Sequence, residues 1–295
     1  MASKKKVFEG AMVALVTPFK NGKIDKTALA RLVEFQIDNG TDVIIPCGTT
    51  GESATMSHDE HRFVMEFVVK QVAGRVPVVC GAGSNNTEEA LGLVQYAKKV
   101  KADGVLVVTP YYNKPTQEGL YRHYSFLAAK SHMPIILYNV PSRTGVSLAP
   151  ETVARLSKLD EVVAVKEASG DLGMVDRIQN LCNLPILSGD DALTLPMISI
   201  GGRGVISVAS NVVPALMSSM VHLALQGDFQ KAYAIHRKIQ YLAGFLFMQT
   251  NPIPVKTILG LMKKISPEVR LPLCEMSSKD VATLKQVTRK MGLLK

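Results

Sequence analysis

Short apolar runs rich in valine and isoleucine alternate along this chain with longer segments of helical periodicity. Apolar runs of this length are typical of strands that are buried on both faces of a parallel sheet. Parallel neighbours need a crossover between them, usually a helix, so the alternation predicts repeated βα units. The predicted strands cover residues 11–16, 43–47, 76–81, 104–108, 134–138, 162–166, 185–188 and 204–207.

A helical segment follows each predicted strand. Eight parallel strands can close into a barrel that leaves no free edge, so we predict an α/β fold, a (β/α)8 TIM barrel. The predicted barrel helices cover residues 26–39, 57–73, 87–101, 117–131, 149–158, 172–180, 192–200 and 214–225.

The strand pattern ends near Gly227, and helical segments at 229–249, 255–264 and 278–291 follow it. We therefore predict two domains: a catalytic barrel over residues 1–227 and a small C-terminal helical domain over residues 228–295.

Charge and cysteine usage limit the possible partners. A net charge of +9 could indicate nucleic acid, a membrane surface or small anionic substrates. The basic residues are scattered, and the clusters at 4–6 and 98–101 are short and free of aromatics. We predict no nucleic-acid and no membrane partner, because no apolar run approaches the roughly 20 residues that cross a bilayer. The start resembles no cleavable leader, and four widely spaced cysteines favour a reducing compartment, so we expect a cytoplasmic protein.

Metal and nucleotide motifs are incomplete in this sequence. His58 and His61 flank Asp59 and Glu60, but the order is not H-E-x-x-H, so we expect no catalytic metal. The glycines at 81–83 lack the third glycine of a dinucleotide fingerprint. We predict a site without a cofactor.

Lys166 ends an apolar run, VVAV, where a solvated lysine is out of place. If Val163 and Val165 face the helices, strand alternation turns Ala164 and Lys166 toward the barrel axis, near the rim where barrel enzymes hold their active sites. Burial disfavours a charged ammonium, so such a lysine can attack a carbonyl as the free amine. The alternative is a structural lysine paired with a carboxylate such as Asp190.

Three further features lie at predicted strand ends. The loop GTTGES at 48–53 offers backbone N–H groups and hydroxyls that suit a carboxylate, or it caps the next helix. Tyr138 can move protons during imine chemistry, or it is a core tyrosine. Arg143, in the predicted loop 140–145, can hold a carboxylate with a bidentate fork, or it is a surface arginine.

Five motifs occur in order at these positions and in the tail. Together they resemble the dihydrodipicolinate synthase family over nearly the whole chain. The motifs are GTTGES at 48–53, YNVP at 138–141, VKEASGD at 165–171, SGDD at 188–191 and NPIPVK at 251–256.

The resemblance implies a lyase in which Lys166 forms an imine with pyruvate. The derived enamine then attacks aspartate semialdehyde, and ring closure gives 4-hydroxy-tetrahydrodipicolinate, the committed step toward diaminopimelate and lysine. It also implies a homotetramer, a dimer of dimers. The implied site is Thr49, Tyr138 and Tyr112 of the partner subunit as proton relay, Thr50 on the pyruvate carboxylate, Arg143 on the aldehyde substrate, and Gly189 and Ile206 around the imine.

The resemblance further implies feedback inhibition by lysine at a separate allosteric site. Glu89 would pair with an ammonium, while Tyr111 and Asn85 would hold the carboxylate. The alternative is a purely structural role, in which these residues are helix caps and surface polar groups. The full candidate set is Ser53, Ala54, His58, His61, Asn85, Glu89 and Tyr111.

Two other functions fit parts of the sequence. One is an N-acetylneuraminate lyase or sugar-acid aldolase, which shares the loop and the lysine. The other is a non-catalytic barrel that binds anionic metabolites or RNA. Arg143 disfavours the first, because a dicarboxylic product needs a cation there, and Lys166, Tyr138 and Thr49 disfavour the second.

Overall fold

The computed structural model describes residues 8–294, so the basic start of the chain, including the cluster at 4–6, lies outside the described residues. Eight parallel strands of this part form one sheet in the order β4-β1-β10-β9-β8-β7-β6-β5. A bridge between Ile44 and Val78 joins its two ends into a ring. The strands are β1 (Gly10–Ala14), β4 (Val43–Ile45), β5 (Val79–Gly81), β6 (Gly104–Val108), β7 (Ile135–Asn139), β8 (Val162–Glu167), β9 (Ile186–Ser188) and β10 (Gly204–Ser207).

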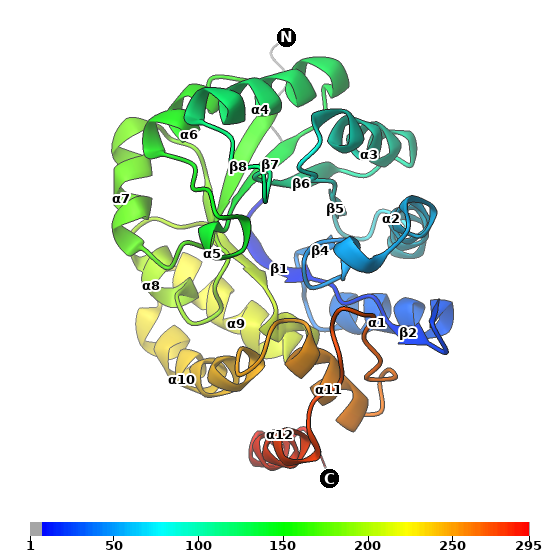
Figure 1. Ribbon diagram of the computed structural model, residues 1–295. Helices are drawn as coiled ribbons and strands as arrows, with labels where there is room; N and C mark the ends of the chain where they lie inside the picture. Colours follow the sequence, from blue (N-terminus) through cyan, green and yellow to red (C-terminus); the bar gives the residue numbers. More distant parts are fainter. Residues whose placement is uncertain (1–7, 295) are drawn as a thin grey trace.

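Helices surround this ring on all sides, as Figure 1 shows along the barrel axis. Each helix lies between two consecutive strands or follows the last one, which is the connectivity predicted from the sequence. A capping box of Ser57 and Glu60 begins α2. The helices are α1 (Lys26–Asp38), α2 (His58–Val72), α3 (Thr87–Lys99), α4 (Gln117–Ser131), α6 (Pro150–Leu156), α7 (Leu172–Leu181), α8 (Thr194–Ser199) and α9 (Pro214–Leu225).

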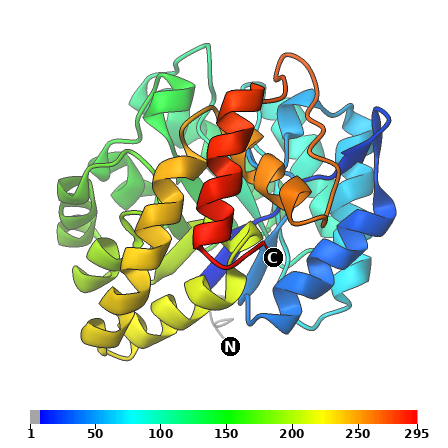
Figure 2. The ribbon, with the colours of Figure 1, turned by 90° about the horizontal axis from the view of Figure 1, so that it is seen from below.

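The tail adds α10 (Phe229–Leu246), α11 (Ile253–Leu261) and α12 (Ser278–Lys290), which pack along one side of the barrel (Figures 1 and 2). Ile239 and Leu242 of α10 belong to the same buried cluster as the barrel helices. Apolar burial therefore continues from barrel to tail. The division into domains at 227/228 stays a prediction.

A second buried cluster fills the barrel interior and includes Met12, Ile45, Leu106, Ile136 and Ile206. Each of these side chains alternates with a neighbour that packs outward against the helices, as expected for strands with two buried faces. The interior is therefore a packed core, not a pore.

One orientation predicted for β8 is wrong. Val163 belongs to the interior cluster together with Ala164, whereas Val162 and Val165 pack outward. The reason is a register shift against β7, where Ile135 pairs with Val162 but Ile136 pairs with Ala164. This bulge inserts one residue, after which alternation resumes and Lys166 points inward as predicted.

Two local elements differ from the predictions. Residues 140–145 were predicted as a loop, but Pro141–Thr144 form the short helix α5, since Pro141 suits a first helical turn. A hairpin of β2 (Phe19–Lys20) and β3 (Lys23–Ile24) was not predicted. Its turn is held from the tail, because Glu268 accepts hydrogen bonds from the N–H groups of Asn21 and Gly22.

Candidate active site

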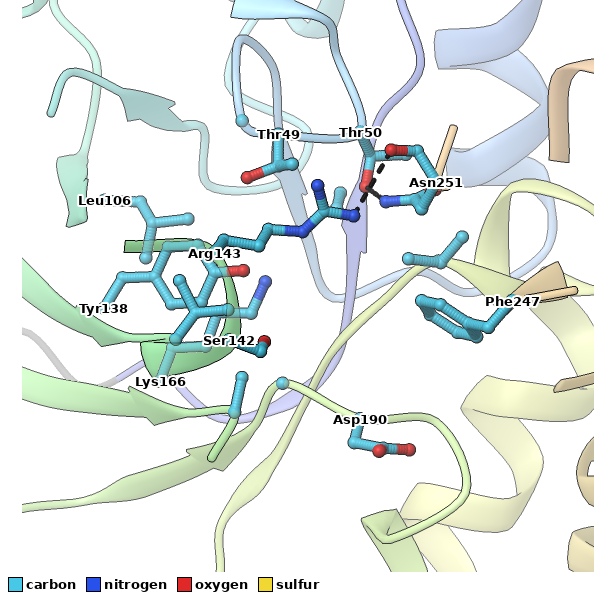
Figure 3. A pocket seen from close by; sticks show the side chains of 16 residues that line it. Thr49, Thr50, Leu106, Tyr138, Ser142, Arg143, Lys166, Asp190, Phe247 and Asn251 are labelled. Carbon is cyan, nitrogen blue, oxygen red and sulfur yellow. Dashed lines mark hydrogen bonds between the residues drawn. The ribbon is translucent and has the colours of Figure 1, made fainter. Parts of the chain in front are cut away.

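A cavity of about 250 Å³ opens at the carboxyl ends of the strands (Figure 3). It collects side chains from β7, β8, the loops after β4 and β9, helix α5 and the tail. Six of the residues predicted for the site line it: Thr49, Thr50, Tyr138, Arg143, Lys166 and Gly189.

Lys166 reaches this cavity from a buried position, with 6% of the residue exposed. Its Nζ lies 4.2 Å from the centre of the Tyr138 ring. Within residues 8–294 no carboxylate forms an ion pair with it, and Asp190 instead accepts a hydrogen bond from the N–H of Ala192. The structural alternative of a Lys166–Asp190 pair is therefore not formed.

Gly189 leaves the space that Lys166 occupies. A Cβ on this glycine would lie 2.5 Å from Cβ of Ala168 and 3.0 Å from Cε of Lys166. Both distances are shorter than van der Waals contact, so the lysine stem passes where any larger residue would place its side chain.

The loop at 48–53 differs from the predicted row of free N–H groups. The N–H groups of Gly51, Glu52 and Ser53 donate to the carbonyls of Gly48 and Thr49 within the loop. The part of the loop that lines the cavity is Gly48, Thr49 and Thr50, whose N–H groups are not among these internal donors. The loop does not cap α2 either, since the Ser57 hydroxyl accepts that hydrogen bond.

Arg143 extends from α5 over the cavity, and its guanidinium points toward Thr50 and Asn251 (Figure 3). Its Nη2 donates to the backbone carbonyl of Asn251 at 3.4 Å. Arg143 is therefore an exposed arginine whose guanidinium faces the cavity and contacts the tail. Sequence reasoning gave no role to Asn251 or Phe247, which line the same cavity from the tail. The motif NPIPVK was the signal for the first, and nothing in the sequence signals the second.

Two predicted site residues lie apart from the cavity lining. Ile206 is buried in the barrel interior, in the cluster that also contains Tyr138 and Ala164. Tyr112 has 89% of its surface exposed and a positive φ of 73°, so its ring projects from the rim into solvent. Their predicted roles stay predictions.

A second cavity of about 400 Å³ lies beside the first and shares Thr49 and Arg143 with it. Six residues predicted for lysine binding line it: Ser53, Ala54, His58, His61, Glu89 and Tyr111. The seventh, Asn85, does not, although its carbonyl accepts a hydrogen bond from the Asn113 side chain at 2.9 Å.

Glu89 and the histidines give this second cavity its charge. Glu89 accepts a hydrogen bond from the Ser84 hydroxyl and lies 3.0 Å from Nε2 of His58. His61 pairs through Nε2 with the carbonyl of Gly81 at 2.8 Å, and burial lowers the pKa of His61. Glu89 offers a carboxylate to a cationic group of a ligand, and Arg143 in the same lining offers a guanidinium to an anionic one.

Residues 8–294 contain no cluster of acidic, histidine or cysteine side chains that could hold a metal ion. In the same range, no helix is long and apolar enough to span a membrane.

A barrel whose rim carries a buried lysine next to a tyrosine, with no ion pair to that lysine in residues 8–294, is typical of imine-forming aldolases. Residues 7–291 match the dihydrodipicolinate synthetase family. This chain belongs to that family, as its motifs predicted.

Individual members of the family match this chain over nearly their full length. The 4-hydroxy-tetrahydrodipicolinate synthase of Syntrophus aciditrophicus is 55% identical over 290 residues, which cover 98% of this chain and all of the relative. The dihydrodipicolinate synthase structure from Aquifex aeolicus has a TM-score of 0.96 and 48% identity, covering 97% of this chain and 99% of that one. DHDPS from Cyanidioschyzon merolae with lysine bound has a TM-score of 0.94 and 40% identity, covering 98% and 100%. The predicted family, barrel fold and lyase class are confirmed.

Proposed function

We propose that Lys166 is the nucleophile in the condensation of pyruvate with L-aspartate 4-semialdehyde to 4-hydroxy-tetrahydrodipicolinate. The reaction is that of the curated relatives, and the predicted activity in lysine and diaminopimelate biosynthesis is thereby confirmed. The observation that supports the nucleophile is the position of Lys166, buried, unpaired among the described residues and facing the cavity.

The chemistry proceeds through an enzyme-bound enamine. The Lys166 amine adds to the C2 carbonyl of pyruvate, and water leaves to give the imine. Loss of a C3 proton gives the enamine, whose C3 attacks the aldehyde of the second substrate. The α-amine of that substrate then attacks C2 and displaces Lys166, which closes the ring and frees the enzyme.

The neighbouring side chains supply proton transfer and charge. The ring centre of Tyr138 lies 4.2 Å from Nζ of Lys166. Tyr138 relays protons together with Thr49 and with Tyr112 of the partner subunit. The Thr50 hydroxyl donates to the pyruvate carboxylate. Arg143, at the outer side of the cavity, binds the carboxylate of the aldehyde substrate through its guanidinium. Gly189 and Ile206 complete the surroundings of the imine.

Product formation tests the proposed reaction directly. The purified chain is given pyruvate plus aspartate semialdehyde, with cleavage of N-acetylneuraminate measured in parallel. We expect product only in the first assay. Cleavage of the sugar acid at a comparable rate would instead favour the aldolase alternative.

Lysine binding in the second cavity would regulate this activity. The acidic Glu89 suits an ammonium, and the shared Thr49 and Arg143 connect the two cavities. The relative from Cyanidioschyzon merolae has lysine bound. We expect partial or non-competitive inhibition toward aspartate semialdehyde that weakens in Glu89→Ala. Full activity at millimolar lysine would remove this proposal and leave the active site unaffected.

A homotetramer built as a dimer of dimers would complete the site. The exposure of the Tyr112 ring supports this proposal, because a tyrosine that is 89% exposed in its own chain is free to contact a neighbouring subunit. Sedimentation analysis should give a tetramer, and Tyr112→Phe should lower kcat without dissociating it. A cytoplasmic location stays a prediction.

A further inference from the structure

The loop that carries Thr49 and Thr50 is held from the tail by a fully buried ion pair. Nζ of Lys256, in α11, lies 2.5 Å from Oε1 of Glu52, and neither side chain is exposed. The second carboxylate oxygen of Glu52 accepts the N–H of Arg270 at 3.2 Å. Lys256 also lies 4.4 Å from the Phe19 ring centre. Two segments of the tail therefore meet at Glu52, two residues after Thr50.

Glu52 needs such support, because its backbone is left-handed with φ of 54°. A non-glycine residue in this region costs free energy and persists only when its surroundings impose it. The turn is also fixed by Thr17, whose hydroxyl donates to the Gly51 carbonyl at 2.7 Å. Loss of Lys256 would also leave a buried carboxylate without its partner.

A second contact from the tail acts on Thr50 itself. Nδ2 of Asn251 donates a hydrogen bond to Oγ1 of Thr50 at 2.9 Å, and both residues are buried (Figure 3). In this amide orientation the nitrogen donates, so the Thr50 hydroxyl directs its own proton elsewhere, and Oδ1 of Asn251 has no hydrogen-bond partner among the described residues. Since Thr50 lines the cavity, that proton is available to an anionic acceptor there.

We infer that Lys256 and Asn251 are positioning residues for carboxylate recognition: Lys256 holds the turn at Glu52, and Asn251 orients the Thr50 hydroxyl as a donor. The inference rests on the proposed function, since it assigns Thr50 to the pyruvate carboxylate. It makes the helical tail a working part of the substrate site.

Borohydride trapping of the imine as a function of ligand concentration tests this inference. The first variant is Asn251→Ala, which leaves the ion pair intact. The second is the double variant Glu52→Gln/Lys256→Met, which leaves no buried charge without a partner. Glu34→Gln is the matched control. It breaks an ion pair far from the site, in which Nη1 of Arg75 lies 2.6 Å from Oε2 of Glu34. The probes are pyruvate and pyruvamide, a neutral 2-oxo compound of nearly the same shape.

We expect the pyruvate concentration for half-maximal trapping to rise roughly tenfold in both variants, as for loss of a hydrogen bond to a charged group. Trapping of pyruvamide should change less than threefold, and kcat at saturating pyruvate should fall much less than KM rises. The control variant should show the same pyruvate and pyruvamide dependence as the wild-type protein. Because the double variant removes both charges together, it should keep its fold while losing pyruvate affinity.

Equal rises for pyruvate and pyruvamide would overturn the inference, since they indicate general damage to the site. Unchanged pyruvate dependence in folded variants would overturn it as well. Absence of trapping in the unchanged protein would instead contradict the proposed nucleophile, so the two failures are distinguishable.

Discussion

Lys166 and Tyr138 are register partners on adjacent parallel strands, with Nζ of the lysine 4.2 Å from the centre of the tyrosine ring. Parallel pairing brings both side chains to the same rim of the barrel. The β8 bulge at Val163, three residues before Lys166, sets this register, so a strand irregularity that the sequence did not predict helps to place the proposed nucleophile beside Tyr138.

Tyr138→Phe should lower kcat by roughly 10² to 10⁴, the range for loss of a general acid or base. The ring would keep its place in the barrel interior, so the thermal midpoint should change little. Steady-state rates and a melting curve measure both. A kcat within threefold of the unchanged enzyme would show that the hydroxyl carries no proton.

Arg143→Ala should reduce kcat/KM for aspartate semialdehyde about tenfold to a hundredfold, since a charge-assisted hydrogen bond contributes roughly 1.5 to 3 kcal/mol. Imine formation with pyruvate should be nearly unaffected, because that step precedes binding of the aldehyde. Initial rates at varied aldehyde concentration, with trapping as the control, separate the two. Equal losses in both assays would contradict a specific role toward the second substrate.

Gly189→Ala should impair imine formation by steric conflict, because the added methyl would lie 3.0 Å from Cε of Lys166 and 2.5 Å from Cβ of Ala168. Gly92→Ala is the matched control, since it lies in α3 with open space around its Cβ. Alanine there should stabilise the helix by up to about 1 kcal/mol. Comparable activity of the two variants would show that the close approach at Gly189 is unimportant.

Asp191 should make stability depend on pH, because full burial raises its pKa from 3.8 to about 6. Between these values the unfolded carboxyl ionises while the folded one keeps its proton, so the free energy of unfolding falls as pH rises. The contribution is complete below pH 3.8 and lost once pH passes about 6.

Asp191→Asn should remove the part of the pH dependence of the unfolding free energy that Asp191 causes. The difference in unfolding free energy between the variant and the unchanged protein should shift by a few kcal/mol at most between pH 4 and 6, at about 1.4 kcal/mol per pKa unit. Denaturant unfolding at several pH values measures it. A difference that is constant across this interval would rule out the raised pKa.

The barrel could be predicted because its signals are local. Glycine or proline stands at the first position of β6, β10 and α9, which were predicted with their observed bounds. Lys166 could be found because strand alternation orients it once its strand is known. The bulge at Val163 could not, since it is a relation between two strands.

The tail's share of the site was missed for a similar reason. Asn251 contacts Thr50 across 201 positions, and no periodicity relates residues so far apart. In the sequence, nothing distinguishes Glu52 and Lys256 from other charged residues. Only the fold shows that they are buried against each other.

Incubation with pyruvate and sodium borohydride, followed by peptide mapping by mass spectrometry, tests the central claim most directly. Reduction fixes only an imine, so the account predicts one added mass, on the peptide that contains Lys166. Lys166→Ala should lose the label yet stay folded, because it removes a charge that is costly to bury. Labelling of another lysine, such as the buried Lys256, or no labelling at all, would contradict the account.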